Sequence, residues 1–249
     1  GFTGYVDSGS IYPVEKNMGL PFISDPDWQF NRQAFYLYVR ARFTLTSREK
    51  NDTNVQIRQN IDTDALFSRR EHLNLAGRAY LLMAIHDTSP ASSMLATLAD
   101  DLESAVIAAP TTAHWEEIHS DWQNWTTDTR TTALVLSALI AIRPQSAMLP
   151  NVVRWLMNAR QIDHWQTTQE TVWSLHALTD WMLFTGELHS AFTVHTMLNG
   201  GALASGAVSP DARTTLTLVL GVQMLLTDRV NQLNIERGAG DGALYYTAA

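Results

Sequence analysis

The side chains best suited to chemistry gather in one short segment, which begins with His114-Trp-Glu-Glu-Ile-His119 and continues to Asp121, Trp122 and Trp125. Two histidines near a glutamate resemble a scrambled form of the zinc-binding motif of metalloproteases. In that motif the histidines stand four positions apart and share one helical face. His114 and His119 would point about 140° away from each other on a helix. The segment therefore does not predict a metal site.

Two other interpretations of this segment remain open. Glycosidases place two carboxyl groups across the bond that they cleave and often stack sugars on aromatic rings. A sugar site here would require the carboxylates of Glu116, Glu117 and Asp121 to converge in a deep cleft. The structural alternative is a tryptophan-rich connection that packs beneath the loops of a helical domain, and the sequence favours it.

Signatures of the common catalytic sites are absent from the sequence. Trp165-Gln166 and Gln169 invite comparison with terpene cyclases, whose helical repeats also use Trp and Gln, but the protonating Asp-x-Asp-Asp is missing. The sequence also contains no Gly-x-Ser-x-Gly, P-loop or Gly-x-Gly-x-x-Gly pattern. It has no cysteine, which excludes thiol nucleophiles, thiolate zinc sites and disulfides. We predict that the chain is not an enzyme and that it holds no metal or cofactor.

Composition narrows the class of protein further. The 249 residues carry 17 Lys and Arg against 25 Asp and Glu, so a net charge of -8 argues against a nucleic-acid partner. The longest apolar stretch, Ala133 to Ile142, is too short to span a membrane, which takes about 20 residues. The absence of cysteine fits a reducing compartment or a bacterial envelope. Because the sequence begins Gly1-Phe2-Thr3, without an initiator Met, we expect it to be a piece of a longer precursor.

The elements around the segment read as a divergent helical repeat. Shifting residues 127 to 142 by 39 positions places Thr132 on Thr171 and Leu136 on Leu175. These helices are apolar on more than one side, so we expect them to be inner helices with their repeated leucines buried. The more polar segments 91 to 107 and 148 to 160 are expected to return along the outside. The repeat is carried by four pairs of residues, Ala34/Leu37, Ala79/Leu82, Ala133/Leu136 and Val172/Leu175.

Helix-end signals and a change in composition divide the chain near residue 188. Thr167 and Glu170 predict a capping box, Pro150 a first helical turn, and Gly186 a helix end. All eight Trp lie at or before Trp181. After the boundary, Gly-rich turns separate short runs typical of antiparallel strands. The predicted strands are residues 191 to 198, 214 to 220, 230 to 236 and 243 to 247. Because a Gly-rich connection precedes the last run, we expect the β unit to keep an unpaired edge.

Five motifs occur in an order that resembles one known family. They are His114-Trp-Glu-Glu117, Thr127-Asp-Thr-Arg-Thr-Thr-Ala-Leu134, Val152-Val-Arg-Trp-Leu-Met157, Trp165-Gln-Thr-Thr-Gln-Glu-Thr171 and Leu175-His-Ala-Leu178. This order is similar to the second half of the alpha-2-macroglobulin and complement thioester domain, and most similar to its bacterial branch. There, the last helix is followed by a Gly-Glu-Leu linker and a strand ending in Asn-Gly, as in Gly186-Glu-Leu188 and residues 192 to 200. The resemblance is specific over residues 114 to 200.

The resemblance implies a mainly α fold. Residues 1 to 188 would form part of an α/α toroid, a terpenoid-cyclase-like helical repeat, and residues 189 to 249 a β-sandwich-like, CUB-like segment. The thioester motif of the family lies upstream of the equivalent of residue 1, so the resemblance assigns no catalytic residue to this chain. Positions matching family motifs would have structural roles. These positions are Trp115, Glu116, Trp165, Gln169 and Glu170.

The resemblance also implies a function for the complete protein. Bacterial members are broad-range endopeptidase inhibitors that trap host or foreign proteases after a bait region is cut. They reside in the periplasm or cell envelope, often as lipoproteins beside peptidoglycan-synthesis enzymes. Two alternatives remain open, namely an α/α-toroid enzyme acting on glycans or isoprenoids, and a helical-repeat module that binds other proteins.

Overall fold

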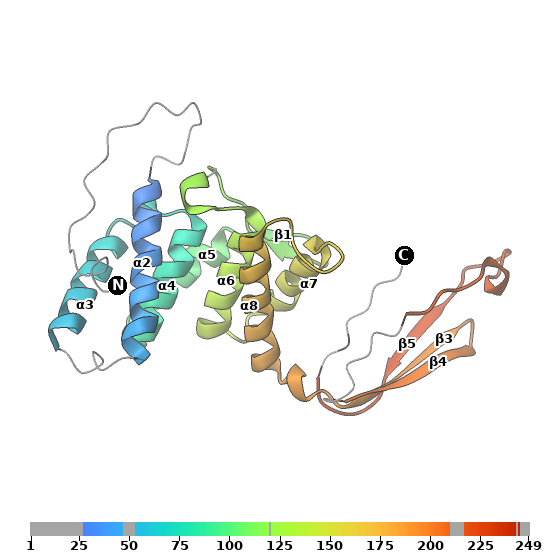
Figure 1. Ribbon diagram of the computed structural model, residues 1–249. Coiled ribbons are helices and arrows are strands. Elements are labelled where there is room, and N and C mark those ends of the chain that lie inside the picture. The colour runs from blue at the N-terminus through green and yellow to red at the C-terminus, as the bar shows by residue number, and fades with distance from the viewer. Residues whose placement is uncertain (1–26, 47–52, 120, 210–216, 243, 245–249) are drawn as a thin grey trace. The chain divides into compact units, whose positions relative to one another are not determined.

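The computed structural model describes residues 27 to 46, 53 to 119, 121 to 209, 217 to 242 and 244 (Figure 1). The chain forms two compact units, residues 1 to 180 and residues 181 to 249. The boundary between them lies inside the last helix, before residue 188.

The described residues confirm a mainly α protein with a small antiparallel sheet. No described helix is both long and apolar enough to cross a lipid bilayer. The helices are α2 (Trp28–Thr46), α3 (Thr53–Phe67), α4 (Leu75–Thr88), α5 (Met94–Ser104), α6 (Asp128–Ile142), α7 (Leu149–Ala159) and α8 (Thr168–Thr185).

Helices of two kinds alternate along the first unit. α4 packs between α2 and α6, and Figure 1 shows these three in a row. α6 buries ten consecutive residues from Arg130 to Leu139, so it is enclosed on all sides. By contrast, α7 buries only the stripe Leu149, Val152, Val153 and Leu156. The prediction that the inner helices are enclosed is confirmed for α4 and α6, and residues 149 to 159 form the predicted one-sided return helix.

The repeated leucines are buried in three of the four copies. Leu37, Leu82 and Leu136 are between 0% and 4% exposed, as predicted. The prediction is wrong for Leu175, which is 53% exposed, and its partner Val172 is 55% exposed. Within the first unit α8 buries Glu170, Ser174 and Ala177, which form one helical stripe. Leu175 lies outside that stripe, on a face of α8 that no described element of the first unit covers.

This difference in burial predicts a large loss of stability for one leucine substitution and a small change for the other. Leu136→Ala should lower the free energy of unfolding by about 2 to 5 kcal/mol, because it leaves a cavity in an enclosed helix. Leu175→Ala should change it by about 0.5 kcal/mol or less, since the side chain already contacts solvent. Urea unfolding followed by far-UV circular dichroism measures both values. Similar losses for the two variants would contradict the assignment of inner and exposed positions.

The predicted helix ends are present. Thr167 and Glu170 form a reciprocal capping box, in which the Glu170 N–H donates to Thr167 Oγ1 at 3.1 Å and the Thr167 N–H donates to Glu170 Oε2 at 3.1 Å. Pro150 lies in the first turn of α7. Gly186 follows α8 with φ of 73°, a left-handed conformation that glycine adopts without steric cost.

The second unit contains a three-stranded antiparallel sheet in the order β4-β3-β5. Its strands are β3 (Phe192–Leu198), β4 (Gly201–Val208) and β5 (Leu233–Arg237). Asn199 and Gly200 join β3 to β4 with φ of 53° and 83°, which is typical of a type I′ hairpin turn. β4 and β5 are edge strands among the described residues. Whether further strands complete the sheet stays a prediction.

The strand predictions are right at β3 and for most of β5, and they miss β4. Residues 217 to 220 belonged to a predicted strand but form none, and the remainder of that run, 214 to 216, lies outside the described residues. The last predicted strand, 243 to 247, falls outside them except for residue 244. β4 was missed because Gly, Ala and Ser dominate its sequence, and such residues are poor predictors of strands.

Candidate functional site

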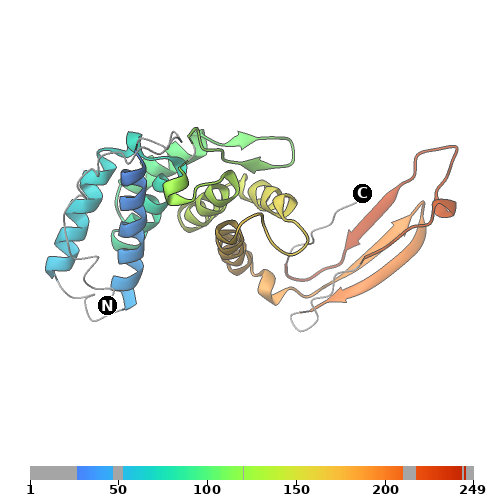
Figure 2. The ribbon, with the colours of Figure 1, turned by 45° about the horizontal axis from the view of Figure 1, so that its top comes forward.

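The connection between α5 and α6 holds the segment that the sequence singles out. It starts as a hairpin of β1 (Ile107–Ala108) and β2 (Ala113–His114), seen beside α6 and α7 in Figure 2. His114 stacks on the Trp155 ring at 4.6 Å between ring centroids, and its Nε2 lies 2.9 Å from Glu116 Oε1. The Glu116 side chain is 55% exposed. His114 and Glu116 thus form a surface pair anchored on α7.

Glu117 turns inward and caps a helix. Its carboxylate accepts hydrogen bonds from the backbone N–H groups of Leu75 and Ala76 at 3.1 and 3.0 Å, at the start of α4. The Thr131 hydroxyl donates to the same carboxylate at 2.8 Å. Burial raises the pKa of Glu117, while these three hydrogen bonds act in the opposite direction. The negative charge lies at the positive end of the α4 dipole and links α6 to α4.

Asp121 is fully buried and organises the rest of the connection. Its carboxylate accepts from the Asn31 side-chain amide at 3.0 Å and from the Asn124 amide at 2.6 Å. Its backbone carbonyl accepts from the Thr126 N–H and hydroxyl. Arg32 adds a hydrogen bond to the Gln123 carbonyl at 2.8 Å. The segment is therefore held to α2 through a buried polar network.

The exposed aromatic side chains of the segment project from this fixed backbone. Trp122 and Trp125 are 44% and 71% exposed, and Ile118 is 91% exposed. Trp125 has φ of 57°, an unfavourable left-handed conformation for a bulky residue. The structural interpretation, a connection packed beneath loops, is right for the buried Trp115 and wrong for Trp125. Asp121 accepts hydrogen bonds from the backbone N–H groups of Asn124 and Thr126, so Trp125 lies in a turn that Asp121 holds from both sides.

Trp115 forms the first of two equivalent junctions between an outer and an inner helix. It is fully buried, and its indole N–H donates to the Leu102 carbonyl in α5 at 2.7 Å. Its backbone N–H donates to the Thr132 hydroxyl in the first turns of α6 at 3.0 Å. One tryptophan thus ties the end of an outer helix to the start of the next inner helix.

Trp165 repeats this arrangement. It is 2% exposed, its indole N–H donates to the Leu156 carbonyl in α7 at 2.9 Å, and its backbone N–H donates to the Thr171 hydroxyl at 3.1 Å. Thr171 is the residue that the sequence aligned with Thr132. The equivalence of the two tryptophans was not predicted from the sequence. We call the two arrangements the tryptophan junctions.

The five residues that match family motifs are thus placed separately rather than in one site. Trp115 and Trp165 occupy the two tryptophan junctions, and Glu170 caps α8. Gln169 and Glu116 are exposed. No three His, Asp or Glu side chains within the described ranges are arranged to hold a metal ion.

The three carboxylates proposed for a sugar site have different partners in the described structure. Glu117 accepts from backbone N–H groups of α4, Asp121 accepts from the Asn31 amide of α2, and Glu116 faces solvent beside His114. Sequence reasoning missed Asn31 and Asn74, which complete these networks. The Asn31 side-chain oxygen accepts from the Asn74 N–H at 3.0 Å. An asparagine directly before the apolar run of α4 was the available signal for a helix cap.

A buried cation lies where α2, α4, α6 and α8 meet. Arg130 is 6% exposed, and its Nη2 donates to the Tyr80 hydroxyl at 2.7 Å. The guanidinium lies 5.7 Å from the centre of the Tyr80 ring and 6.0 Å from that of Trp173. Burial raises the pKa of Tyr80, and the nearby Arg130 opposes that rise. The positive charge of Arg130 therefore lies largely against the faces of the Tyr80 and Trp173 rings.

His176 offers a test of local electrostatics on α8. The Nδ1–H of His176 donates to the Asp180 carboxylate, with Nδ1 and Oδ2 3.1 Å apart, and this hydrogen bond raises the pKa of His176 more than burial lowers it. The stability that the pair contributes is present below the ordinary histidine pKa of about 6.5 and is lost as the pH rises through the folded value. An NMR titration should give His176 a midpoint above that of a histidine peptide, and Asp180→Asn should lower it. An unchanged midpoint in that variant would show that the pair does not form.

Comparison with known protein families and with curated proteins gave no match. No protein-family model matches the sequence, and no curated protein is significantly similar to it.

Proposed function

We propose that the chain is part of a bacterial alpha-2-macroglobulin, in which it forms the C-terminal part of the helical thioester domain and the β domain that follows. The observation that carries the proposal is the pair of tryptophan junctions. The motifs around Trp115 and Trp165 have the order that the resemblance requires, and each fills the same structural role at successive turns of one helical repeat. The family resemblance comes from the order of sequence motifs, and the repeat comes from the hydrogen bonds of the two tryptophans. Both support the same assignment.

The proposed architecture of residues 1 to 188 is a partial α/α toroid. The alternation of enclosed helices, such as α6, with one-sided outer helices, such as α7, supports it. Val172 and Leu175 are exposed apolar residues on α8. In a helical repeat, the last helix of an array exposes an apolar face where the next helix would pack. Their exposure therefore supports a further helix in the complete protein that packs on α8. The proposed fold of residues 189 to 249 is a β-sandwich-like, CUB-like domain, of which β3, β4 and β5 would be one layer.

In this proposal the complete protein is a broad-range endopeptidase inhibitor and the chain is a scaffold, not an enzyme. A protease cuts a bait segment elsewhere in the protein, stored strain is released, and the protease is enclosed. Its partners are proteases and, in the periplasm, the peptidoglycan-synthesis enzymes beside which a lipid-anchored form would lie. The structural use of Glu117 and Asp121 supports the scaffold role over a glycan-cleaving or isoprenoid-cyclising toroid enzyme, because both carboxylates are engaged with backbone or amide donors.

A helical-repeat binding module is the second candidate. The exposed Trp122, Trp125 and Ile118 favour it, since tryptophan is enriched among the residues that contribute most to protein interfaces. This candidate needs no protease partner.

The trap is tested with the protein encoded by the complete gene. After incubation with trypsin and removal of free enzyme, an enclosed protease should still cleave a small chromogenic peptide, while casein is protected because it is too large to enter. The same protein denatured beforehand is the control, and it should give no protection. Equal cleavage of both substrates, or no association with trypsin, would reject the trap and leave the binding module.

The chain itself should be chemically inert. Incubation with methylamine or with a panel of proteases should add no mass beyond that of nicked fragments, because the covalent chemistry of the family needs a cysteine side chain and this sequence has none. Intact-mass measurement checks this. Turnover of a glycan substrate that is abolished in Glu116→Gln would contradict the scaffold assignment.

A further inference from the structure

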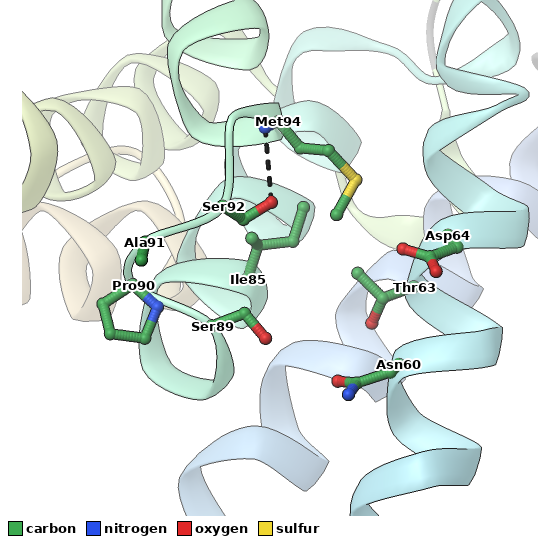
Figure 3. A pocket seen from close by; sticks show the side chains of 9 residues that line it. All are labelled: Asn60, Thr63, Asp64, Ile85, Ser89, Pro90, Ala91, Ser92 and Met94. Carbon is green, nitrogen blue, oxygen red and sulfur yellow. Dashed lines mark hydrogen bonds between the residues drawn. The ribbon is translucent and has the colours of Figure 1, made fainter.

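An open cavity of about 380 Å³ lies between α3, the end of α4 and the connection to α5, as Figure 3 shows. Thr63 lines it, and the Thr63 hydroxyl oxygen has no hydrogen-bond partner among the described residues. That oxygen is shielded from solvent, so a molecule in the cavity would not reach it. The remaining lining does not identify a ligand. The second unit, by contrast, contains a side chain that can react with its own backbone.

The turn between β3 and β4 contains Asn199 followed by Gly200, and no other asparagine of the 249 residues precedes a glycine. Deamidation begins when the backbone nitrogen of the following residue attacks the carbonyl carbon of the asparagine side chain. A glycine in that position leaves the nitrogen unhindered, because it has no Cβ. Asn199 and Gly200 are both exposed. Apart from its chain neighbours, no described atom lies within 4 Å of the place where a Cβ would stand on Gly200, so solvent reaches the reacting groups.

The side-chain amide of Asn199 is held by two hydrogen bonds. Its Nδ2 donates to Asn231 Oδ1 at 2.9 Å, and its Oδ1 accepts from the Gln232 N–H at 2.9 Å. We call these two contacts the amide clip. The Asn199 N–H also donates to the Gln232 carbonyl at 2.9 Å. Rotation of the side chain toward the Gly200 nitrogen would break both bonds of the clip, so the fold slows a reaction that the sequence favours.

Asn231 is itself fixed in one orientation. The Leu226 N–H donates to Asn231 Oδ1 at 2.7 Å, and Asn231 Nδ2 donates to the Leu226 carbonyl at 2.9 Å. A flipped Asn231 amide would set its donor against the Leu226 N–H and its acceptor against the Leu226 carbonyl. Residue 199 must therefore supply a donor to Asn231 Oδ1. A carboxylate in place of the Asn199 amide would set two acceptor oxygens against each other.

We propose that Asn199 is a site of spontaneous deamidation, that the amide clip sets the rate of the reaction, and that the reaction opens the clip. The Gly200 nitrogen gives its proton to solvent base and forms a bond to Asn199 Cγ. The bond from Cγ to Nδ2 breaks, and the leaving nitrogen takes a proton from water and departs as ammonia, so a succinimide ring remains. Water then opens the ring at either carbonyl and gives aspartate or isoaspartate. The product carries one more negative charge and lacks the donor that Asn231 requires.

Opening the clip frees the connection that leads into β5. Asn231 and Gln232 tie this connection to the turn between β3 and β4, and β5 begins directly after them at Leu233. Because the released ammonia is lost to solvent, the change runs in one direction. Deamidation at residue 199 thus acts as a slow, one-way release of the segment that joins β5 to the sheet. The proposal is independent of the protease-trap function.

The experiment incubates the whole chain in mildly alkaline buffer and follows residue 199 by peptide mapping and mass spectrometry. The same chain in concentrated urea, where the clip is absent, gives the unprotected rate, and the folded wild type should react more slowly than that. Asn231→Ala removes the acceptor of the Asn199 amide. It should deamidate about tenfold faster than the folded wild type, as expected for the loss of one hydrogen bond.

Two comparison variants separate the clip from general loosening of the segment. Asn231→Asp keeps an oxygen acceptor for the Asn199 amide but, like Asn231→Ala, loses the donor to the Leu226 carbonyl. It should therefore react more slowly than Asn231→Ala, even if both changes loosen the connection. Asn234→Ala removes an exposed amide from β5, outside the clip, and should react as the wild type does.

The consequence of the reaction is tested with Asn199→Asp. Hydrogen exchange should become faster at the Leu226 and Gln232 amides, while the amides that pair β3 with β4 keep their protection. Equal deamidation rates for the wild type and Asn231→Ala, equal rates for the two Asn231 variants, or unchanged exchange in Asn199→Asp would each overturn the proposal.

Discussion

Replacing Trp115 by alanine is expected to lower the free energy of unfolding of the helical unit by about 3 to 5 kcal/mol. The side chain is fully buried and ties α5 to α6 through hydrogen bonds to Leu102 and Thr132. Its removal leaves a large cavity and takes away one of the two hydrogen bonds that the Leu102 carbonyl accepts, while the Ala105 N–H still donates to it. Trp165→Ala should have an effect of similar size at the second tryptophan junction, because the contacts there are equivalent. Urea unfolding followed by far-UV circular dichroism measures both losses.

Two further variants separate burial from the hydrogen bonds. Trp125→Ala removes a side chain of the same type that is 71% exposed, and should change stability by about 0.5 kcal/mol or less. Trp115→Phe keeps most of the buried ring but loses the bond to Leu102, so its loss should lie between those of Trp125→Ala and Trp115→Ala. If Trp125→Ala were as destabilising as Trp115→Ala, the tryptophan junction would not be what joins the helices.

Glu117→Ala is expected to lower the free energy of unfolding by about 3 kcal/mol, because it removes a half-buried helix cap. The change leaves the N–H groups of Leu75 and Ala76 and the hydroxyl of Thr131 without their acceptor. Each unpaired buried donor costs about 1 to 3 kcal/mol, and partial access to water reduces the sum. Thermal and urea unfolding measure the loss.

The neighbouring Glu116 provides the matched control. Glu116→Ala removes an exposed carboxylate and should be nearly neutral. Hydrogen exchange should also become faster at the Leu75 and Ala76 amides in Glu117→Ala and not in Glu116→Ala. A larger loss from Glu116→Ala would show that the two adjacent carboxylates have been assigned the wrong roles.

The features that the sequence predicted correctly are those coded by neighbouring residues. The enclosed pattern of α6, the capping box of Thr167 and Glu170, and the Gly-rich turn that follows residue 198 each depend on a few residues close in sequence. The exposure of Leu175 depends instead on which elements cover α8, and no local pattern carries that information. β4 forms because β3 offers it a pairing edge, although its own residues are poor strand formers.

The roles at the candidate site were harder to predict because they depend on distant contacts. Glu117 caps a helix that begins 42 residues earlier, and Asn31 bonds to Asp121 across 90 residues. The match between Trp115 and Trp165 was hidden by unequal spacing. Trp115 is 17 residues from its threonine, whereas Trp165 is only 6 residues from its own. A comparison at a fixed offset aligns the threonines and misses the tryptophans.

This unequal spacing means that each tryptophan junction joins the same two helix ends, whatever the length of the loop between them. Each junction fixes where the next inner helix begins. Residues can therefore be inserted between the tryptophan and the threonine without displacing that helix. The longer loop, between Trp115 and Thr132, already includes the exposed Trp122 and Trp125. Such a loop is a natural insertion point, where new surface can be gained in evolution, or grafted by design, while the helical framework stays unchanged.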